Sequence, residues 1–409
     1  MHSVEEIKNG VYWMGCNDFL TPLFERIFPI PDGVSYNSFF IDDEKTCVLD
    51  AMDKVCRDEF LEDVEYLLHG RQLDYFIIQH MEPDHASSAL ALVEKYPNVK
   101  IVGQAQTFKF FEQFYSEDYK ANYMTVTEGD QLDLGKHKLQ FIKAPMVHWP
   151  EVIMTYDLTD KILFSADAFG MFGTVGNIFA DQVEYEEEYL DEARRYYVNI
   201  VGKYGAQVMA VLKKASGLQI DYICPIHGLV FRTPETIQYI IEKHLHWAQY
   251  VPEKKGVVIA FASIYGDTAR AACVLANKLS KAGVHNVMMY DVSKVHPSYI
   301  NAKAWEYSHL VLPTYNLNLF LPMENFLHDL STLSFQKRKI AVLGCHTWSS
   351  VAHKEMVNYV ENVFKNCELF PTTLDMKSSL HKDQESIIDA MAKEIADDVA
   401  AYPDPNTLI

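Results

Sequence analysis

Cysteine is scarce in this chain, and no two cysteines form a recognisable motif. The seven cysteines among 409 residues stand at positions 16, 47, 56, 224, 273, 345 and 367, without any CxxC pair. An odd and scattered set argues against a disulfide framework, a zinc ribbon and a rubredoxin-type iron site. We therefore predict reduced thiols, in a protein of a reducing compartment, the cytoplasm.

Long apolar runs and basic charge are also lacking. No stretch approaches the roughly 20 apolar residues that span a bilayer, and the start Met1–Glu6 does not resemble a signal peptide. The 36 Lys and Arg residues face 56 Asp and Glu residues, for a net charge of -20. Because this charge repels phosphate groups, neither nucleic acid nor a membrane is an expected partner. The length suits two globular domains.

A cluster of metal-binding side chains follows the apolar stretch Tyr75–Ile78. Further candidates each end an apolar run of their own downstream. The seven candidate ligands are His80, Glu82, Asp84, His85, His148, Asp167 and His227. Seven ligands on four loops indicate two metal ions. A mixed imidazole and carboxylate set without thiolate favours iron, manganese or zinc, and His85 is either a ligand or a group that orients one.

The first part of the chain alternates strands with ligand-bearing loops. We expect strands at 46–50, 100–103, 138–144, 152–156, 161–166 and 219–224, a helix over 86–96, and a mostly helical stretch over 183–217.

The pattern changes near residues 252–256 to regular alternation of short strands and helices. Strands are expected at 257–262, 287–291, 310–313, 339–344 and 368–373, with a last helix over 382–400. Five parallel strands with helices on both faces are the flavodoxin plan, whose ligand lies beyond the carboxyl ends of the strands. We therefore predict two domains, residues 1–252 and 253–409.

Three loops of the second domain are candidates for a flavin site. The first opens a helix with a glycine between hydroxyl side chains, which suits a phosphate group; the other two follow the third and fourth strands. The residues concerned are Ser263, Ile264, Tyr265, Gly266, Asp267 and Thr268; Pro313, Thr314, Tyr315 and Asn316; and Gly344, Cys345, His346, Thr347 and Trp348.

These two motif sets resemble a known family. The first is similar to the HxHxDH motif of the metallo-β-lactamase superfamily, but Glu82 replaces its second histidine. The resulting HxExDH pattern, with the later His148, Asp167 and His227, looks like that of flavodiiron proteins. The resemblance implies an αββα metallo-β-lactamase-like domain with two irons, followed by a flavodoxin-like domain with FMN. Where the family more often has Ser-Tyr-Gly-Trp, this chain has residues 345–348 as Cys-His-Thr-Trp.

The resemblance also implies roles and partners. His80, Glu82 and His148 would hold one iron, Asp84 and His227 the other, and Asp167 would bridge them. The implied reaction is four-electron reduction of O2 to water, with reduction of NO to N2O as the alternative. A separate donor, either a rubredoxin or an NAD(P)H-linked flavoprotein, would supply electrons to a head-to-tail homodimer or a dimer of dimers. Two rivals stay open: a zinc hydrolase of the glyoxalase II type fused to a flavodoxin module, and an electron carrier with a vestigial metal site.

Overall fold

The computed structural model describes residues 2–116 and 119–409 and divides the chain into two compact units. The first comprises Met1–Tyr197 and Ala206–Glu242, and the second comprises Val198–Gly205 and Lys243–Ile409. The division therefore lies within helix α8 (Pro234–Ala248). The expected domain boundary at residue 252 stays a proposal.

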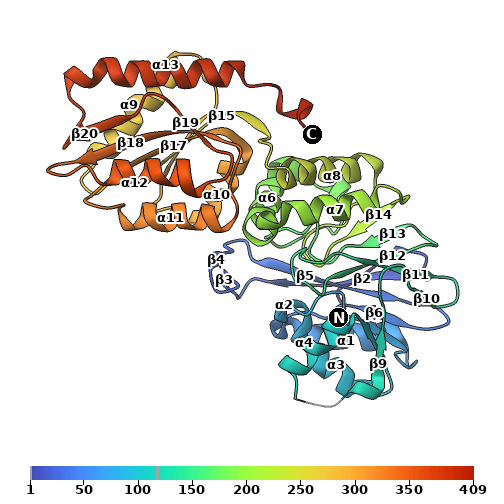
Figure 1. The fold of residues 1–409 in the computed structure, drawn as a ribbon. Helices are drawn as coiled ribbons and strands as arrows, with labels where there is room; N and C mark the ends of the chain where they lie inside the picture. Colours follow the sequence, from blue (N-terminus) through green and yellow to red (C-terminus); the bar gives the residue numbers. More distant parts are fainter. Residues whose placement is uncertain (1, 117–118) are drawn as a thin grey trace. The chain divides into compact units, whose positions relative to one another are not determined.

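The first unit is built around two β-sheets (Figure 1). The seven-stranded sheet has the order β1 (Val4–Lys8), β2 (Val11–Asp18), β5 (Val34–Ile41), β6 (Cys47–Leu49), β7 (Tyr75–Ile77), β8 (Lys100–Gly103) and β9 (Tyr123–Thr125). The five-stranded sheet has the order β10 (Gln131–Asp133), β11 (Lys138–Lys143), β12 (Ile153–Asp157), β13 (Ile162–Phe164) and β14 (Tyr222–Cys224). All eight residues of β5 are buried, as a central strand covered on both faces requires.

Helices cover the outer faces of the two sheets, which completes the expected αββα sandwich (Figure 1). On one side lie α1 (Arg57–Leu68), α2 (Pro83–Ala86), α3 (Ala89–Lys95) and α4 (Ala105–Phe114); the other helices are α5 (Tyr185–Glu188), α6 (Leu190–Tyr196), α7 (Gly205–Ala215) and α8. A short hairpin joins β3 (Leu23–Phe24) to β4 (Phe28–Pro29). Strands β6 to β9 are parallel, as are β13 and β14, so the loops after β7 and β8 leave one edge of a sheet.

The second unit is a doubly wound parallel sheet of the predicted kind. Its strands are β15 (Lys254–Phe261), β16 (Val287–Asp291), β17 (Tyr307–Tyr315), β18 (Lys339–His346), β19 (Glu368–Leu369) and β20 (Leu374–Lys377). The path β16-β15-β17-β18-β19 has the five expected positions, but two short strands share the last one, since β20 also pairs with β18. Pro371 interrupts the strand expected at 368–373 because proline cannot donate to a sheet.

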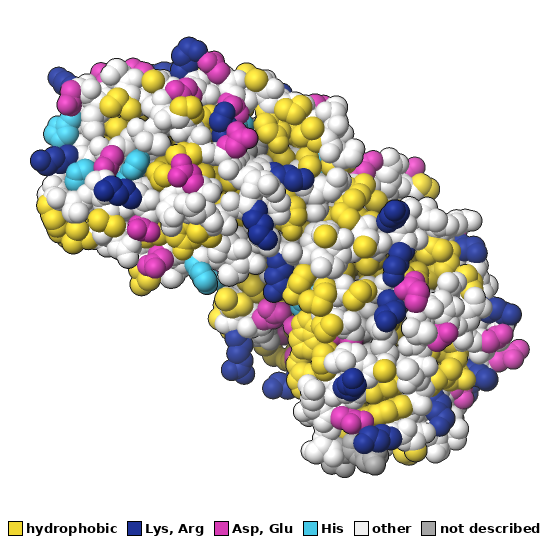
Figure 2. Space-filling view, viewed as in Figure 1, with side chains coloured by type: hydrophobic (Ala, Val, Ile, Leu, Met, Phe, Trp, Pro, Cys, Tyr) yellow, Lys and Arg dark blue, Asp and Glu magenta, His cyan; other side chains and the backbone are white. Residues whose placement is uncertain are grey.

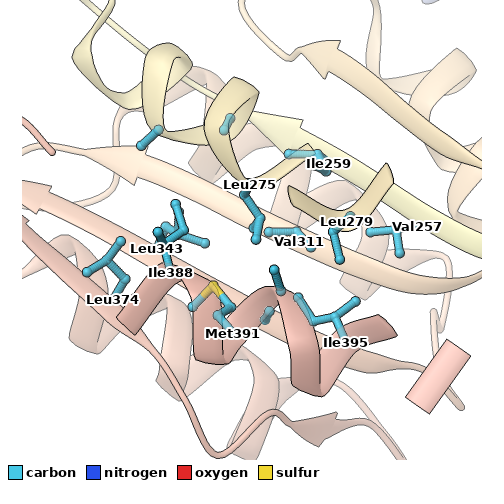
Figure 3. Packing of buried hydrophobic residues seen from close by; sticks show 14 of the residues in the cluster. Val257, Ile259, Leu275, Leu279, Val311, Leu343, Leu374, Ile388, Met391 and Ile395 are labelled. Carbon is cyan, nitrogen blue, oxygen red and sulfur yellow. The ribbon is translucent and has the colours of Figure 1, made fainter. Parts of the chain in front are cut away.

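Helices pack on both faces of this sheet (Figure 1): α9 (Asp267–Lys281) and α13 (Glu385–Ala401) on one, and α10 (Pro297–Glu306), α11 (Leu321–Thr332) and α12 (Ala352–Asn358) on the other. Figure 3 shows apolar side chains of α9 and α13 against the sheet. Leu275 and Leu279 recur at helical spacing on α9, as do Met391 and Ile395 on α13, and all four are buried. These side chains form the apolar core between this face of the sheet and the two helices.

One expectation about the cysteines is wrong. Cys16 and Cys56 form a disulfide with Cα atoms 6.0 Å apart, whereas Cys47, Cys224, Cys273, Cys345 and Cys367 are free thiols. Cys16 stands on β2, and Cys56 ends the short 3-10 helix before α1. The fold brings together two positions separated by 40 residues, and their spacing carries no signal of that contact.

None of the helices in the described part of the chain is long and apolar enough to cross a membrane. On the face shown in Figure 2, basic side chains are interspersed with acidic ones. The acidic excess of the chain therefore does not make that face uniformly negative.

Candidate di-iron centre and flavin site

The predicted metal ligands come from four loops that meet at one place in the first unit. His80, Glu82, Asp84 and His85 follow β7, the last two within the short helix α2. His148 stands between β11 and β12, whereas Asp167 follows β13 and His227 follows β14. All seven side chains are largely buried. The structure thus gathers every candidate ligand that the sequence indicates.

The first group of ligand atoms contains His80, Glu82, His148 and Asp167, within 4.8 Å of one another. The Nε2 atom of His80 lies 3.2 Å from Glu82 Oε2 and 3.2 Å from Asp167 Oδ2. His148 Nε2 lies 2.8 Å from the same oxygen of Glu82. Two imidazoles and two carboxylates therefore face one point.

The second group contains Asp84, His85 and His227. Asp84 Oδ2 lies 3.2 Å from His227 Nε2 and 3.1 Å from His85 Nε2, and the two imidazole nitrogens are 2.9 Å apart. Asp167 turns its other oxygen, Oδ1, toward this group, 3.6 Å from His85 Nε2. The two oxygens of Asp167 thus face different groups, which supports its proposed role as a bridge. His85 stands among the atoms of the second group.

The outer hydrogen bonds of the histidines show that these groups suit a cation. His227 Nδ1 lies 2.7 Å from the carbonyl oxygen of Ser35, which can only accept, so this nitrogen carries the hydrogen. His227 Nε2 then turns a lone pair toward the Asp84 carboxylate. Two acceptors at this distance repel unless a proton or a metal ion lies between them. Asp84 Oδ1 is also buried and accepts no hydrogen bond from the described residues.

The carboxylates of the centre remain ionised at neutral pH. Burial and the nearby Asp84 raise the pKa of Glu82, but hydrogen bonds from His148 and His80 outweigh them and lower it to about 2. Burial lowers the pKa of His85, but Asp84 and Asp167 raise it to about 10 when no metal is bound. A metal ion would replace protons on such histidines, and an anionic oxygen-rich set suits iron better than a neutral histidine set.

Two residues that the sequence analysis missed support the ligands from outside. Tyr196 is fully buried on α6, and its hydroxyl donates to Asp167 Oδ1 at 2.7 Å. Glu151 is fully buried, and its Oε1 lies 2.8 Å from His80 Nδ1. Glu151 stands only three positions after His148, but no spacing rule distinguishes it from the other carboxylates of the chain.

A cavity of about 440 Å³ opens beside the metal groups. Its walls include Glu82 and Asp84, the loop of the β3–β4 hairpin with Glu25, and the ring of Tyr36. When no metal is bound, burial and the charge of Glu82 raise the pKa of Glu25 to about 9. The cavity offers a small substrate a route to the ligands.

A third cluster of the first unit lies away from this centre. His137 Nδ1 lies 2.8 Å from Asp157 Oδ2, and Asp160 Oδ2 is 3.8 Å from the same nitrogen. His137 Nε2 faces the carbonyl of Asn9 at 3.1 Å. Burial lowers the pKa of His137, but the hydrogen bond to Asp157 outweighs this effect, and the net pKa is raised. A protonated imidazole that donates from both nitrogens therefore explains this cluster.

The three predicted flavin loops converge in the second unit. They line one cavity at the carboxyl ends of β15, β17 and β18, together with Ser378, which follows β20 and which the sequence analysis missed. The lining residues are Ser263, Ile264, Tyr265, Asp267, Thr268, Tyr315, Cys345, Thr347 and Ser378. Of the other predicted residues, Gly266 caps α9, Pro313, Thr314, Gly344 and His346 lie on β17 or β18, Asn316 directly follows β17, and Trp348 is exposed.

The cavity has backbone N–H groups and hydroxyl groups that suit a flavin phosphate. Gly266 has φ of +100°, which lets the loop turn directly into α9, whose first backbone N–H groups have no partner within the helix. The hydroxyl of Thr268 lies in this first turn, and Thr314 has a buried hydroxyl without a hydrogen-bond partner among the described residues. Tyr265 and Trp348 are 90% and 71% exposed beside the cavity, as residues that could cover a planar ring would be.

The Cys-His-Thr-Trp variation has a structural counterpart. His346 Nδ1 lies 3.0 Å from Asp375 Oδ1, and the hydroxyl of Ser350 donates to the other oxygen of this carboxylate. Cys345 is buried, and burial raises the pKa of its thiol. Both contacts tie this segment to Asp375 on the neighbouring strand β20.

Comparisons with known proteins agree with this architecture. Residues 34–228 match the family model described as ODP family beta lactamase. An anaerobic nitric oxide reductase flavorubredoxin of Vibrio vulnificus is 30% identical over 85% of this chain and 70% of its own length. An uncharacterized protein of Methanocaldococcus jannaschii is also 30% identical, over 89% of this chain and 90% of its own.

Solved structures are similar over the whole chain. The rubredoxin oxygen:oxidoreductase of Desulfovibrio gigas superposes with a TM-score of 0.91 at 25% identity, over 97% of this chain and 99% of its own. The flavodiiron protein of Giardia intestinalis gives 0.92 at 25% identity, over 98% of each chain.

Fold and site together define a metallo-β-lactamase-like domain with two metal groups, joined to a flavodoxin-like domain with a flavin cavity. The chain belongs to the flavodiiron protein family. It is an oxidoreductase whose cofactors are FMN and a di-iron centre, and the resemblance noted in the sequence is confirmed.

Proposed function

We propose that this chain reduces O2 to water and that NO is its second substrate. The observation that carries the proposal is the meeting of two ligand groups at Asp167, whose two oxygens face one group each. When bound, two ferrous ions supply two electrons and reduced FMN supplies two more, which together meet the four that O2 requires.

The residues of the chain provide the setting for this chemistry. Imidazoles and ionised carboxylates of the two groups hold the metal pair in a buried site beside the 440 Å³ cavity. Burial and the nearby Asp167 keep the pKa of Tyr196 well above its ordinary value, so its hydroxyl stays protonated and holds the carboxylate of Asp167 in place. The cavity is wide enough to admit a diatomic molecule to Glu82 and Asp84, which line its wall.

NO is retained as the second substrate because the Vibrio relative is named a nitric oxide reductase, whereas the Desulfovibrio structure is named an oxygen oxidoreductase. The test is to measure consumption of O2 and of NO by the same iron-loaded, FMN-containing preparation with the same electron donor. A higher kcat/KM for O2 supports the proposal. A higher value for NO would reverse the order of the two substrates.

The zinc hydrolase rival is disfavoured by Glu82, which places a second carboxylate in the first ligand group, and by the flavin cavity of the second unit. The electron-carrier rival is disfavoured because the ligand set is complete. Metal analysis decides both: about two irons per chain with bound flavin fit the proposal, and zinc in their place would contradict it.

For the electron donor we propose a rubredoxin, because the similar Desulfovibrio protein is named for it. An NAD(P)H-linked flavoprotein is the alternative. Rapid mixing with reduced rubredoxin should reduce the flavin within the time of one turnover, and a slower reduction than by the flavoprotein would reverse this assignment. The cytoplasmic location also stays a proposal. Because Cys16 and Cys56 form a disulfide, a test of this location includes whether these two cysteines are oxidised in the cell.

For the assembly we propose a head-to-tail homodimer, alone or within a dimer of dimers, in which the flavin of one subunit faces the irons of the other. Tyr265 and Trp348 are exposed at the flavin cavity, and Phe19 and Leu20 are exposed before the hairpin that lines the metal cavity. Exposed apolar groups at both sites favour burial against a partner.

Complementation tests this assembly. One chain carries His80→Ala with Asp167→Ala, the other carries Ser263→Ala with Thr268→Ala or a stronger flavin-site lesion, and two tags isolate the mixed dimer. Each homodimer should be inactive while the mixed dimer consumes O2. A mixed dimer that holds both cofactors and consumes none would show that electrons pass within one chain.

A further inference from the structure

Glu151 is a buried carboxylate that no expected role of the metal centre uses. It is fully buried between His148 and strand β12. Its Oε1 lies 2.8 Å from His80 Nδ1 and accepts from the backbone N–H of Met81 at 2.9 Å. The other oxygen, Oε2, is buried without a hydrogen-bond partner among the described residues. An ionised group in such a place needs a compensating positive charge.

The backbone of Glu151 is held as firmly as its side chain. Gln104, at the start of α4, donates from Nε2 to the carbonyl oxygen of Glu151 at 2.6 Å and to that of Val152 at 3.2 Å. The carboxylate therefore has a defined position relative to the imidazole of His80. A side chain fixed from both ends can fix the ring that it contacts.

The histidines of the two groups differ in what lies behind them. His80 is backed by the carboxylate of Glu151, and His227 by a neutral backbone carbonyl. The outer nitrogen of His85 has no hydrogen-bond partner within the described residues. A carboxylate behind a ligand imidazole fixes its tautomer and raises its basicity more than a neutral acceptor does. The two metal groups are consequently unequal in donor strength.

We propose that Glu151 is a positioning residue that makes the first group, His80 with Glu82 and His148, the tighter and more electron-rich metal site. Its charge keeps the hydrogen of His80 on Nδ1 and turns the lone pair of Nε2 toward the metal. In a buried site this charge is poorly screened, so its effect on His80 is strong. The inference rests on the two-metal assignment and not on whether O2 or NO is reduced.

The decisive change is Glu151→Gln, which keeps the size of the side chain but removes its charge. We expect the first site to lose about 10- to 100-fold in metal affinity, the range for such outer partners of metal ligands, while the second site is unchanged. Glu151→Asp keeps the charge on a shorter side chain and should restore part of the lost affinity. This order would not follow from packing alone, because glutamine fills the space better than aspartate.

The experiment titrates Co²⁺ into metal-free, FMN-containing protein and follows the visible absorption of the bound cobalt. Wild type should bind two ions in separable steps, with the tighter step weakened in Glu151→Gln and its absorption bands shifted. The matched control is Asp157→Asn, since Asp157 is also fully buried and also lies 2.8 Å from a histidine Nδ1, but away from the centre. Its cobalt binding should equal that of wild type.

Four results would overturn the proposal. Unchanged binding by Glu151→Gln would show that the carboxylate does not act through His80. Equal weakening of both steps, or weaker binding by Glu151→Asp than by Glu151→Gln, would indicate a purely structural role. If Glu151→Gln fails to fold, the cobalt titration of Glu151→Asp tests the proposal instead. This variant should weaken only the tighter cobalt-binding step. A wild type that binds one cobalt would overturn the two-metal assignment and the proposal with it.

Discussion

Replacement of Tyr196 by phenylalanine tests how the carboxylate of Asp167 is kept between the two ligand groups, the position proposed for a bridge. The change removes one hydroxyl, which donates to Asp167 Oδ1 at 2.7 Å. The ring contacts with Phe172 and His227, at centroid distances of 5.1 and 5.4 Å, are retained. The acceptor is ionised, because attraction by the histidines outweighs its burial and lowers the pKa of Asp167.

The size of the effect follows from the charge of the acceptor and from burial. A hydrogen bond to a charged group contributes about 1.5 to 3 kcal/mol to stability, compared with about 0.5 to 1.5 kcal/mol between neutral groups. Both partners are fully buried, so solvent cannot replace the lost donor. We expect metal-free Tyr196→Phe to lose about 1.5 to 3 kcal/mol of unfolding free energy.

The assay is a double-mutant cycle with Asp167→Asn in urea, on metal-free protein. FMN release marks unfolding of the second unit. A urea transition that occurs without FMN release is therefore assigned to unfolding of the first unit. A matched control is Tyr115→Phe, whose hydroxyl donates to the neutral carbonyl of Ala86 and should cost about 0.5 to 1.5 kcal/mol. A coupling energy near zero between positions 196 and 167 would refute the reasoning.

Three further predictions follow from other parts of the molecule. Glu82→His should shift occupancy from iron toward zinc and abolish O2 reduction with the fold and FMN intact; metal analysis and an oxygen electrode check this, and wild-type activity would contradict it. Ser263→Ala with Thr268→Ala should weaken FMN binding by about 0.5 to 1.5 kcal/mol per lost hydrogen bond and leave the iron content unchanged. Flavin titration measures this, and wild-type affinity would contradict it. His137→Gln should destabilise the protein mainly at acidic pH. The folded-state pKa of His137 is raised, so its contribution is full below the unfolded value of about 6.5 and is lost as pH rises through the folded value; equal destabilisation in urea at pH 6 and pH 9 would count against the charged pair.

The sequence predicts the parts of the site that lie at the ends of strands. His80, Asp167 and His227 each follow an apolar run, and the parallel strands before the last two bring those residues to one edge. The flavin loops are predictable for the same reason, since β15, β17 and β18 are parallel and adjacent. Loops that follow neighbouring parallel strands therefore lie close together in the fold, although they are far apart in the sequence.

What the sequence does not reveal depends on contacts between elements without a repeating pattern. Glu151, Tyr196 and Ser378 are ordinary residue types in loops or on a helix, and only the folded chain shows what they face. The disulfide Cys16–Cys56 is hidden for the same reason, because neither cysteine belongs to a motif. The split of the last strand into β19 and β20 follows from Pro371. The apolar pattern alone predicts one continuous strand there.

The central claim is that the metal pair and the flavin together deliver four electrons to O2. The most direct measurement is the number of reducing equivalents consumed per O2 by the iron-loaded, FMN-containing protein, with hydrogen peroxide assayed in the same reaction. The account predicts four electrons per O2 and no peroxide above the level given by free FMN. Two electrons per O2 with stoichiometric peroxide would contradict it.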